Sequence, residues 1–442
     1  MKIVDKLSDK LLPIATKLNN QRHLTSIRDS FIVTMPLIMA ASIFILLNAL
    51  IFSNAWVNQF VDLSQLANLA TLMNNATLGI LAILVCYNIG VNLSTWYVNN
   101  GRISASGFNS INAGGLSVAL MFLMMPVTSQ VTLTNGKTAE ATGIFMQSLT
   151  SSSGLFVAMF AGILGTELFV HFSQYDKLKI KLPDGVPPAV ASTFNSLIPE
   201  VLVLIVVAVP VYAITTLSKL SIPDIINTAI QTPLRGFVLS PVGMIFLQFI
   251  SDFLWVFGLH GSSILSPITT APQLQSIQEN MTAFAHHQAI PNIVNGPFIG
   301  SYGLLGGGGC MMALIIAIFL VSKLEAQKSI AKLALVPSVF NIAEPIMFGL
   351  PVVMNPIFMI PAALIPSLNL VIAYVLTNIG IVGRMVAMAP WITPTGIQTY
   401  VSTAGNIPAT ILTFLLLALD VLIYIPFVMA SNKVKSTNEA KA

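Results

Sequence analysis

The sequence has 442 residues, of which 55% are hydrophobic and only 8% are charged, and its mean hydropathy is +0.84. About a quarter of the residues in a soluble globular protein are charged, so the composition excludes that class and indicates a polytopic membrane protein. The formal net charge of +4 comes from 20 basic and 16 acidic residues. Because the sequence contains no basic cluster with interleaved aromatic residues, we expect no nucleic-acid partner.

The first 28 residues carry six Lys or Arg and two Asp. This segment is too long and too charged for a signal peptide and is typical of a short cytosolic helix. Ten apolar stretches follow, each close to the ~20 residues that cross a bilayer. They are Asp29–Phe52, Leu78–Val98, Phe108–Val127, Leu155–Phe172, Leu197–Leu217, Phe237–Gly258, Tyr302–Val321, Pro351–Pro366, Leu368–Met388 and Ile407–Ala430.

Two further segments, Asn54–Asn74 (which includes Trp56) and Ser221–Arg235, have apolar residues spaced as in interfacial amphipathic helices. Gly261–Gly300 and Leu333–Leu350 are rich in Pro, Asn, Gln, Ser and Gly but lie between spans. They are candidates for re-entrant segments, with an ordinary loop as the alternative reading of each.

Basic residues at both ends of the chain predict that the N- and C-termini lie in the cytosol, and ten crossings satisfy both. The same count places 323–332 outside, although its three lysines favour the inside, so at least one segment is re-entrant or miscounted. We therefore predict an all-α polytopic membrane protein with about ten transmembrane helices, re-entrant hairpins and interfacial amphipathic helices. Residues 1–235 would form an N-terminal dimerisation bundle, and residues 236–442 a substrate-binding transport half.

One carboxylate, Glu344, lies in the apolar stretch from Asn341 to Pro351. An ionisable residue inside a membrane segment is a functional-site hypothesis by default. Pro345 and Pro351 each remove a backbone donor and oppose a continuous helix there, and broken backbone persists in a membrane only where protein or a water-filled cavity covers it. We therefore expect Glu344 to line a cavity, with His260, which is flanked by glycines at another helix break, as its counterpart.

The C-terminal half contains a set of hydrogen-bonding side chains that suits a sugar, because amides and carboxylates bind hydroxyls while an aromatic ring supports the C–H face. The set is His260, Asn292, Asn295, Asn341, Glu344, Asn355, Gln398 and Asn406, with Trp255 and Trp391 close in sequence. Alternatively, an Asn in a membrane helix can serve only to hydrogen-bond one helix to another, and a Trp can lie in the interfacial aromatic belt. Arg102 fits a cytosolic orientation charge better than a ligand, but we keep it among the candidate binding residues.

Other charged or reactive residues carry less information. Asp252, Glu167, Arg384 and Asp420 lie in apolar surroundings, where a site cannot be told from a structural ion pair. Cys86 and Cys310 lie in apolar runs and are better explained as small hydrophobic residues than as a disulfide or a metal site. No nucleotide-binding, hydrolase or metal-binding motif is present, so we expect no cofactor, no metal and no catalysis by this chain alone.

A resemblance is carried by Gly-Leu-His-Gly at 258–261, Asn-Ile-Ala-Glu-Pro at 341–345 and the glycine run at 306–309. With about ten spans, these motifs resemble enzyme IIC, the membrane component of the bacterial phosphoenolpyruvate-dependent sugar phosphotransferase system (PTS). The lactose, cellobiose and diacetylchitobiose branch is the most similar. One departure is that a Gly-Gly-Ser-Gly followed by Thr is expected, whereas this chain has Gly-Gly-Gly-Gly-Cys-Met at 306–311.

The resemblance implies that His260 and Glu344 hold a disaccharide such as cellobiose or diacetylchitobiose, with Glu344 orienting or deprotonating its 6-hydroxyl. A phosphocysteine on a soluble IIB protein, supplied in turn by IIA, would phosphorylate that hydroxyl during uptake. Twelve residues follow the last predicted span, so we expect IIB to be a separate partner. The resemblance also implies a homodimer in the bacterial cytoplasmic membrane.

A proton-coupled secondary sugar transporter is the alternative, in which Glu344 and His260 would form a proton relay. Broken helices near the midplane are typical of such transporters as well. Many of them are built from inverted repeats, and no such repeat is visible in this sequence.

Overall fold

A computed structural model of the protein describes residues 13–14, 16–53, 57–104, 108–133, 136–180, 186–350 and 352–439. Trp56, Pro351 and residues 1–12 of the expected N-terminal helix lie outside these ranges. The chain divides into two compact units, which we describe separately. The larger unit contains Met1–Asn19, Met39–Thr71 and Gly236–Ala442, and the smaller unit contains Asn20–Ile38 and Leu72–Arg235.

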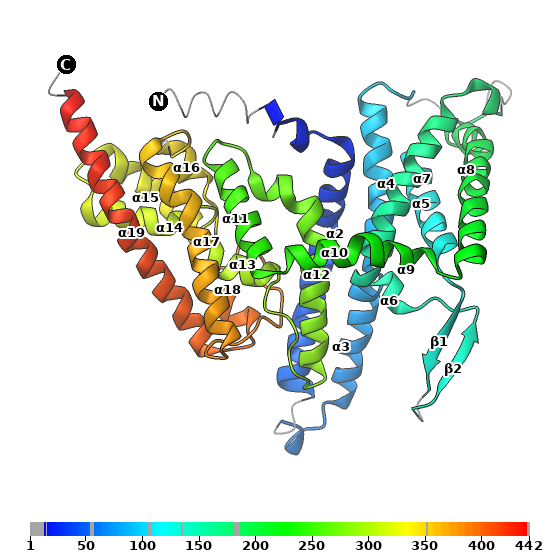
Figure 1. The fold of residues 1–442 in the computed structure, drawn as a ribbon, viewed down its shortest axis with the longest axis horizontal. Helices are drawn as coiled ribbons and strands as arrows, with labels where there is room; N and C mark the ends of the chain where they lie inside the picture. The colour runs from blue at the N-terminus through cyan, green and yellow to red at the C-terminus, as the bar shows by residue number, and fades with distance from the viewer. Residues whose placement is uncertain are drawn as a thin grey trace. The chain divides into compact units, whose positions relative to one another are not determined.

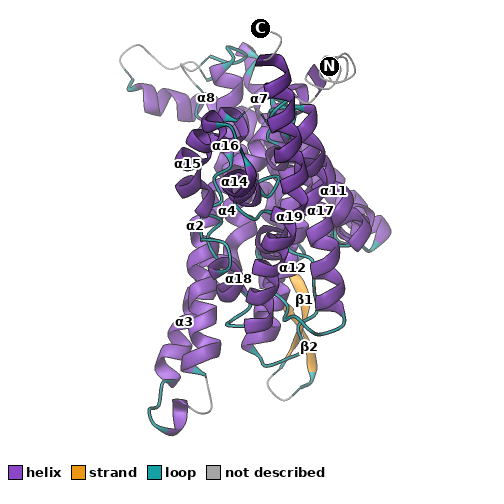
Figure 2. Cartoon of the chain, turned by 90° about the vertical axis from the view of Figure 1, so that its left-hand side faces the viewer, coloured by secondary structure: helices purple, strands orange, loops and turns teal. Residues whose placement is uncertain are grey.

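The described part of the chain is almost entirely helical (Figure 1), with one strand pair, coloured orange in Figure 2. Up to residue 238 the elements are α2 (Arg22–Leu47), η1 (Asn48–Phe52), η2 (Val57–Gln59), α3 (Ser64–Thr77), η3 (Leu78–Ile80), α4 (Leu81–Asn99), α5 (Ser110–Met124), β1 (Thr128–Thr132), β2 (Thr138–Thr142), α6 (Gln147–Thr150), η4 (Ser152–Gly154), α7 (Leu155–Ser173), η5 (Asp176–Leu178), α8 (Pro188–Ser218), α9 (Ile222–Ile226), η6 (Asn227–Gln231) and α10 (Thr232–Val238). They are followed by α11 (Pro241–Trp255), α12 (Gly261–Ala285), α13 (Gly296–Gly303), α14 (Met311–Val321), α15 (Glu325–Val339), α16 (Glu344–Gly349), α17 (Pro356–Asn378), α18 (Ile397–Ser402) and α19 (Ile407–Glu439).

The fold is that of an all-α polytopic membrane protein. Six described helices are long and apolar enough to cross a bilayer, or seven if Ile222–Val238 and Pro241–Trp255 together form one broken span. Two shorter apolar helices, α5 and α14, add to these. The predicted count of ten is therefore not confirmed.

Two of the predicted spans are one helix. One predicted span, Pro351–Pro366, ends at Pro366 and the next, Leu368–Met388, begins at Leu368, but α17 runs unbroken from Pro356 to Asn378 with Pro361 and Pro366 inside it. Membrane helices tolerate internal prolines because neighbouring groups satisfy the freed carbonyls, so a proline there marks a helix end less reliably than in water.

The first predicted interfacial segment also differs. After the short helix η2, an α-helix begins only at Ser64, and the helical stretch Gln65–Asn99 counts as one candidate span. The second segment, Ser221–Arg235, does form a short helical stretch. It begins at a capping box in which Ser221 and Asp224 bond each other's backbone N–H, an arrangement that stabilises a helix N-terminus.

The core of the smaller unit is formed by α4, α5 and α7, with α8 packed against α5 and α7. Small residues allow this close approach: a Cβ added to Gly90 would lie 2.6 Å from the carbonyl oxygen of Ala113, and one added to Gly165 would lie 2.6 Å from Leu120 Cδ1. Glycine is therefore required where α4 meets α5, and the bundle could not close around a larger residue without moving.

Glu167 ties three helices of the smaller unit together. Its Oε1 accepts from His23 Nε2 at 2.6 Å and from Arg22 Nε at 3.1 Å, and the hydroxyl of Tyr97 donates to Oε2 at 2.7 Å. The Arg22 guanidinium also lies 5.1 Å from the centre of the Tyr97 ring. These contacts from α2 and α4 to α7 give Glu167 a structural role that its sequence surroundings did not indicate.

In the larger unit, α11 packs against α12 and α17, and α14 packs against α15 and α19. The predicted re-entrant segment Gly261–Gly300 contains the 25-residue helix α12, a loop and the start of α13, and Leu333–Leu350 contains the end of α15 and α16. Both segments are thus helices interrupted by turns. His260 and Asn341 lie in the turns at residues 256–260 and 340–343, and Trp255 and Glu344 lie at the helix ends beside these turns.

Candidate functional site

His260 lies at the break between α11 and α12, as the N-cap residue of α12. Its Nδ1 atom is 3.4 Å from the backbone nitrogen of Ser263 and 2.9 Å from the hydroxyl of the same residue. A backbone N–H can only donate, so Nδ1 is an acceptor and the neutral ring carries its proton on Nε2. His260 is exposed, and its Nε2–H can donate to a hydroxyl oxygen.

Gly261 explains the position of the His260 turn. A Cβ added to Gly261 would lie 2.0 Å from the carbonyl oxygen of Ser251 in α11. No real Cβ approaches a backbone atom so closely, so the start of α12 can pack on α11 only with glycine at this position. The glycine that follows the histidine in the sequence motif is therefore a packing requirement.

Trp255, the last residue of α11, lies beside His260. The two ring centres are 4.7 Å apart at an interplanar angle of 65°, and the centre of the Phe348 ring lies 6.0 Å from that of Trp255. Trp255 is only 8% exposed, and its Nε1–H has no hydrogen-bond partner among the described residues. This burial suits a residue that supports the imidazole better than one that offers an open face to a sugar.

The segment Leu304–Cys310, which we call the glycine loop, connects α13 to α14 and contacts both candidate motifs. A Cβ added to Gly307 (φ +96°) would lie 2.8 Å from the Asn341 carbonyl oxygen, and one added to Gly308 would lie 3.0 Å from Trp255 Cδ1. Gly308 stands where the family pattern leads us to expect Ser. With glycine there, no side-chain hydroxyl is available to Trp255 Nε1 from this position.

The hydrogen-bonding groups of the Asn341 side chain are all bonded to other residues of the chain. Its Nδ2 donates to the carbonyl oxygens of Trp391 at 2.8 Å and Thr393 at 2.9 Å, and its Oδ1 accepts from the Gly306 backbone at 3.2 Å. An Asn amide has two N–H donors and one acceptor oxygen, so each of its groups already has a partner. The side chain therefore joins the glycine loop to the segment that carries Trp391.

Glu344 is the first residue of α16 and is exposed. Its carboxylate makes no hydrogen bond or ion pair with the residues that the structure describes. Ala343, immediately before it, is buried against the glycine loop, where its Cβ lies 2.7 Å from the position of a Cβ added to Gly307. The turn that presents Glu344 is thus fixed by backbone packing, while the carboxylate itself is left available to a ligand.

The remaining candidates are less closely linked. Trp391 is 59% exposed, and its backbone is held by Asn341 as described above. Arg102 belongs to the smaller unit, where it is exposed in the turn after α4 and its backbone nitrogen donates to the Tyr97 carbonyl. The larger unit thus links Trp255, His260, Asn341, Glu344 and Trp391 through the glycine loop, and Arg102 is not part of that set.

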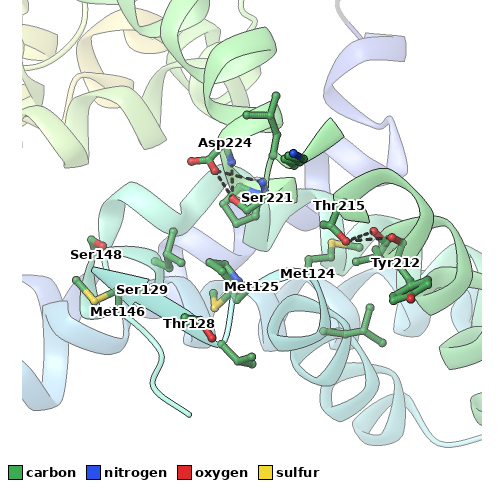
Figure 3. A pocket seen from close by; sticks show the side chains of 18 of the residues that line it. Met124, Met125, Thr128, Ser129, Met146, Ser148, Tyr212, Thr215, Ser221 and Asp224 are labelled. Carbon is green, nitrogen blue, oxygen red and sulfur yellow. Dashed lines mark hydrogen bonds between the residues drawn. The ribbon is translucent and has the colours of Figure 1, made fainter. Parts of the chain in front are cut away.

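A cavity of about 790 Å³ lies in the smaller unit, between the end of α5, β1, the end of α8 and the start of α9 (Figure 3). Met125, Thr128, Tyr212 and Asp224 are among its lining residues, and Asp224 is bonded to the Ser221 hydroxyl at 2.6 Å. None of the six candidate residues lines it. The cavity therefore does not coincide with the polar constellation of the larger unit.

The family model for the phosphotransferase system EIIC component matches residues 28–366. The chain belongs to the EIIC family of the phosphotransferase system. It is 32% identical to the oligo-beta-mannoside-specific EIIC component of Bacillus subtilis (strain 168), covering 98% of this chain and 95% of the relative. It is also 32% identical to the cellobiose-specific EIIC component of Geobacillus stearothermophilus, with 99% and 96% covered.

A solved structure agrees with this membership of the EIIC family. The chain matches the crystal structure of the transporter ChbC, the IIC component of the N,N'-diacetylchitobiose-specific phosphotransferase system, with a TM-score of 0.90. The two chains are 29% identical, and the match covers 98% of this chain and 99% of ChbC. The protein is therefore a sugar-specific membrane component of a PTS, as its motifs at 258–261 and 341–345 indicated.

Proposed function

We propose that the larger unit binds a disaccharide of the cellobiose or diacetylchitobiose class through His260 and Glu344. The observation that carries the proposal is the presentation of two exposed titratable side chains at helix starts, both supported by the glycine loop. His260 Nε2–H is a donor and the Glu344 carboxylate is an acceptor, so together they match the donor and acceptor character of neighbouring sugar hydroxyls. The sugars named for the relatives support this substrate class.

The chemistry that we propose is group translocation. A phosphocysteine on a IIB partner, recharged through IIA, transfers its phosphoryl group to the sugar 6-hydroxyl: the S–P bond breaks, an O–P bond forms, and Glu344 orients the hydroxyl or takes its proton. Such a transfer depends mainly on positioning and charge stabilisation, with a base near the attacking hydroxyl. The charged product cannot cross back. We place the protein in the bacterial cytoplasmic membrane with both termini in the cytosol.

Calorimetric titration with cellobiose and diacetylchitobiose tests the site. Glu344→Gln and His260→Ala should each weaken binding by about 1–3 kcal/mol, because each leaves a buried hydroxyl of the sugar without its partner. Matched controls are Glu325→Gln on α15 and His286→Ala at the other end of α12, which change exposed residues of the same types. If Glu344→Gln and His260→Ala fold and bind like the controls, the assignment is wrong.

The alternative, a proton-coupled sugar transporter, uses the same two titratable side chains and is separated by an uptake experiment. In vesicles without an ion gradient, we expect sugar to enter and be phosphorylated only when phosphorylated IIB is present, with unphosphorylated IIB as the control. Accumulation of unmodified sugar driven by a proton gradient in the absence of IIB would instead establish the symporter.

A further inference from the structure

The backbone N–H and C=O of Gly309, near the end of the glycine loop, are each bonded by a buried side chain. Its N–H donates to Asp252 Oδ1 at 3.2 Å, and its carbonyl oxygen accepts from the Tyr424 hydroxyl at 2.6 Å. Asp252, on α11, is 2% exposed, and Tyr424, on α19, is fully buried. Two helices thus fix the two consecutive peptide groups that meet at Gly309.

The glycine loop needs such external bonds because its backbone is irregular. Gly306, Gly307, Gly309 and Cys310 all have positive φ, so no helix or strand ladder can satisfy their backbone groups. A buried backbone N–H or C=O without a partner costs free energy comparable to a lost hydrogen bond. The bonds from Asp252 and Tyr424 therefore help to select the conformation that the loop adopts.

Asp252 is a buried carboxylate without an ion-pair partner among the described residues. Its second oxygen accepts from Gln248 Nε2 at 2.6 Å. Burying an acidic group among apolar helices is costly unless the group is hydrogen-bonded. Both carboxylate oxygens are used here, one by the same helix and one by the glycine loop.

We propose that Asp252 and Tyr424 are positioning residues for sugar binding, which act through the glycine loop on the two sugar-binding motifs. From Gly309 the loop runs back to Gly308 against Trp255, which packs on His260, and to Gly306 and Gly307 against Asn341 and Ala343, which precede Glu344. A shift of Gly309 moves both contacts together. This proposal rests on the function proposed above.

The chain supplies a matched pair of variants for the test. Tyr424→Phe removes the hydroxyl that bonds Gly309, whereas Tyr302→Phe removes an equally buried hydroxyl of the same unit that has no partner among the described residues. Measured by calorimetry with cellobiose and diacetylchitobiose, we expect Tyr424→Phe to weaken binding about two- to tenfold, the range of one lost hydrogen bond, and Tyr302→Phe to leave it unchanged. Equal affinities for the two variants would overturn the proposal.

A double-mutant cycle separates positioning from a general loss of stability. Tyr424 is remote in sequence from Trp255, and the glycine loop lies between them. If the loop transmits the effect, Tyr424→Phe should weaken binding less in a Trp255→Phe background than in the wild type, because one route to His260 is already altered. Strictly additive losses would contradict the proposed route.

Measuring Glu344→Gln beside these variants distinguishes a failure of the positioning role from a failure of the proposed binding site. If Glu344→Gln weakens binding and Tyr424→Phe does not, only the positioning role fails. If Glu344→Gln binds sugar like the wild type, the proposed binding site itself fails.

Discussion

Asn341 shows how one residue type can support two opposite interpretations. Its place three residues before Glu344 made it a candidate sugar ligand, because a planar amide suits hydroxyls. In the structure its amide instead bonds the carbonyls of Trp391 and Thr393 and the backbone of Gly306, with φ at +62°. A direct contact to sugar stays a prediction, but the geometry favours a role in holding Trp391 and the glycine loop together.

Replacement of Asn341 by glycine isolates the contribution of this amide. Glycine accepts a φ of +62° without strain, so Asn341→Gly removes the side-chain bonds while keeping the backbone conformation accessible. We expect the free energy of unfolding in detergent to fall by about 1–3 kcal/mol, measured by denaturant titration. Met354→Gly is the control, since Met354 has a φ of +58° and is 37% exposed. Equal stability of the two variants would mean that the Asn341 bonds contribute nothing.

At the scale of elements, hydropathy located the helices more reliably than their ends. α7 lies within one residue of its predicted span, because an apolar run interrupted only by Thr166, Glu167 and His171 extends from Leu155 to Phe172. α17 was predicted as two spans that meet at Pro366, although a membrane helix can retain an internal proline. Apolar content fixes which segments are buried in lipid, whereas neighbouring helices decide whether a proline ends one.

The strand pair β1–β2 was missed altogether. Its strands pair antiparallel from Thr128 with Thr142 to Thr132 with Thr138. The signal was present in the sequence, since β-branched residues on both sides flank an Asn-Gly dipeptide, the strongest short-range hairpin signal. A search for spans of 20 residues passes over strands of five.

The site was only partly accessible from sequence. His260 and Glu344 could be picked out because titratable residues are rare in apolar segments, and the structure places both at helix starts. Asp252 and Tyr424, the partners of Gly309, could not be picked out from the sequence, because they contact the glycine loop only after α11 and α19 pack around it. Contacts between residues more than 50 positions apart leave no local pattern in a single sequence.

At the scale of the whole molecule, the chain's two contact units do not follow chain order completely. The two units meet in the chain between Arg235 and Gly236, where the two predicted halves also divide. Met39–Thr71, however, belongs to the same unit as the C-terminal residues. The division of labour that we propose, a dimerisation half at 1–235 and a transport half at 236–442, stays a prediction. In it, the transport half moves past a fixed dimer scaffold, with 219–235 as the hinge.

The homodimer is the prediction that tests this division. Two-fold pairing is the commonest closed assembly of identical chains, and exposed apolar side chains of the smaller unit offer surfaces for it. Ile32 and Val33 on α2 are each 59% exposed and Ile111 on α5 is 61% exposed, while Leu320 on α14 of the larger unit is 64% exposed. Similar exposure makes Leu320 a matched control, because a cysteine at any of these positions can be reached by a cross-linker.

Single cysteines at Ile32, Val33 and Ile111 should therefore cross-link between protomers in membranes, and a cysteine at Leu320 should not. The native Cys86 and Cys310 are fully buried, so they need not be removed before the bifunctional maleimide is added and the products are separated by electrophoresis. A cysteine at Val209 on α8 is a third position to test, because only 17% of that span is buried within the chain. Cross-linking at Val209 alone would move the interface to α8 within the same half, whereas cross-linking at Leu320 alone would place it in the transport half. The second result would contradict a fixed scaffold built from residues 1–235, since the half that carries His260 and Glu344 would then be the one held at the two-fold axis.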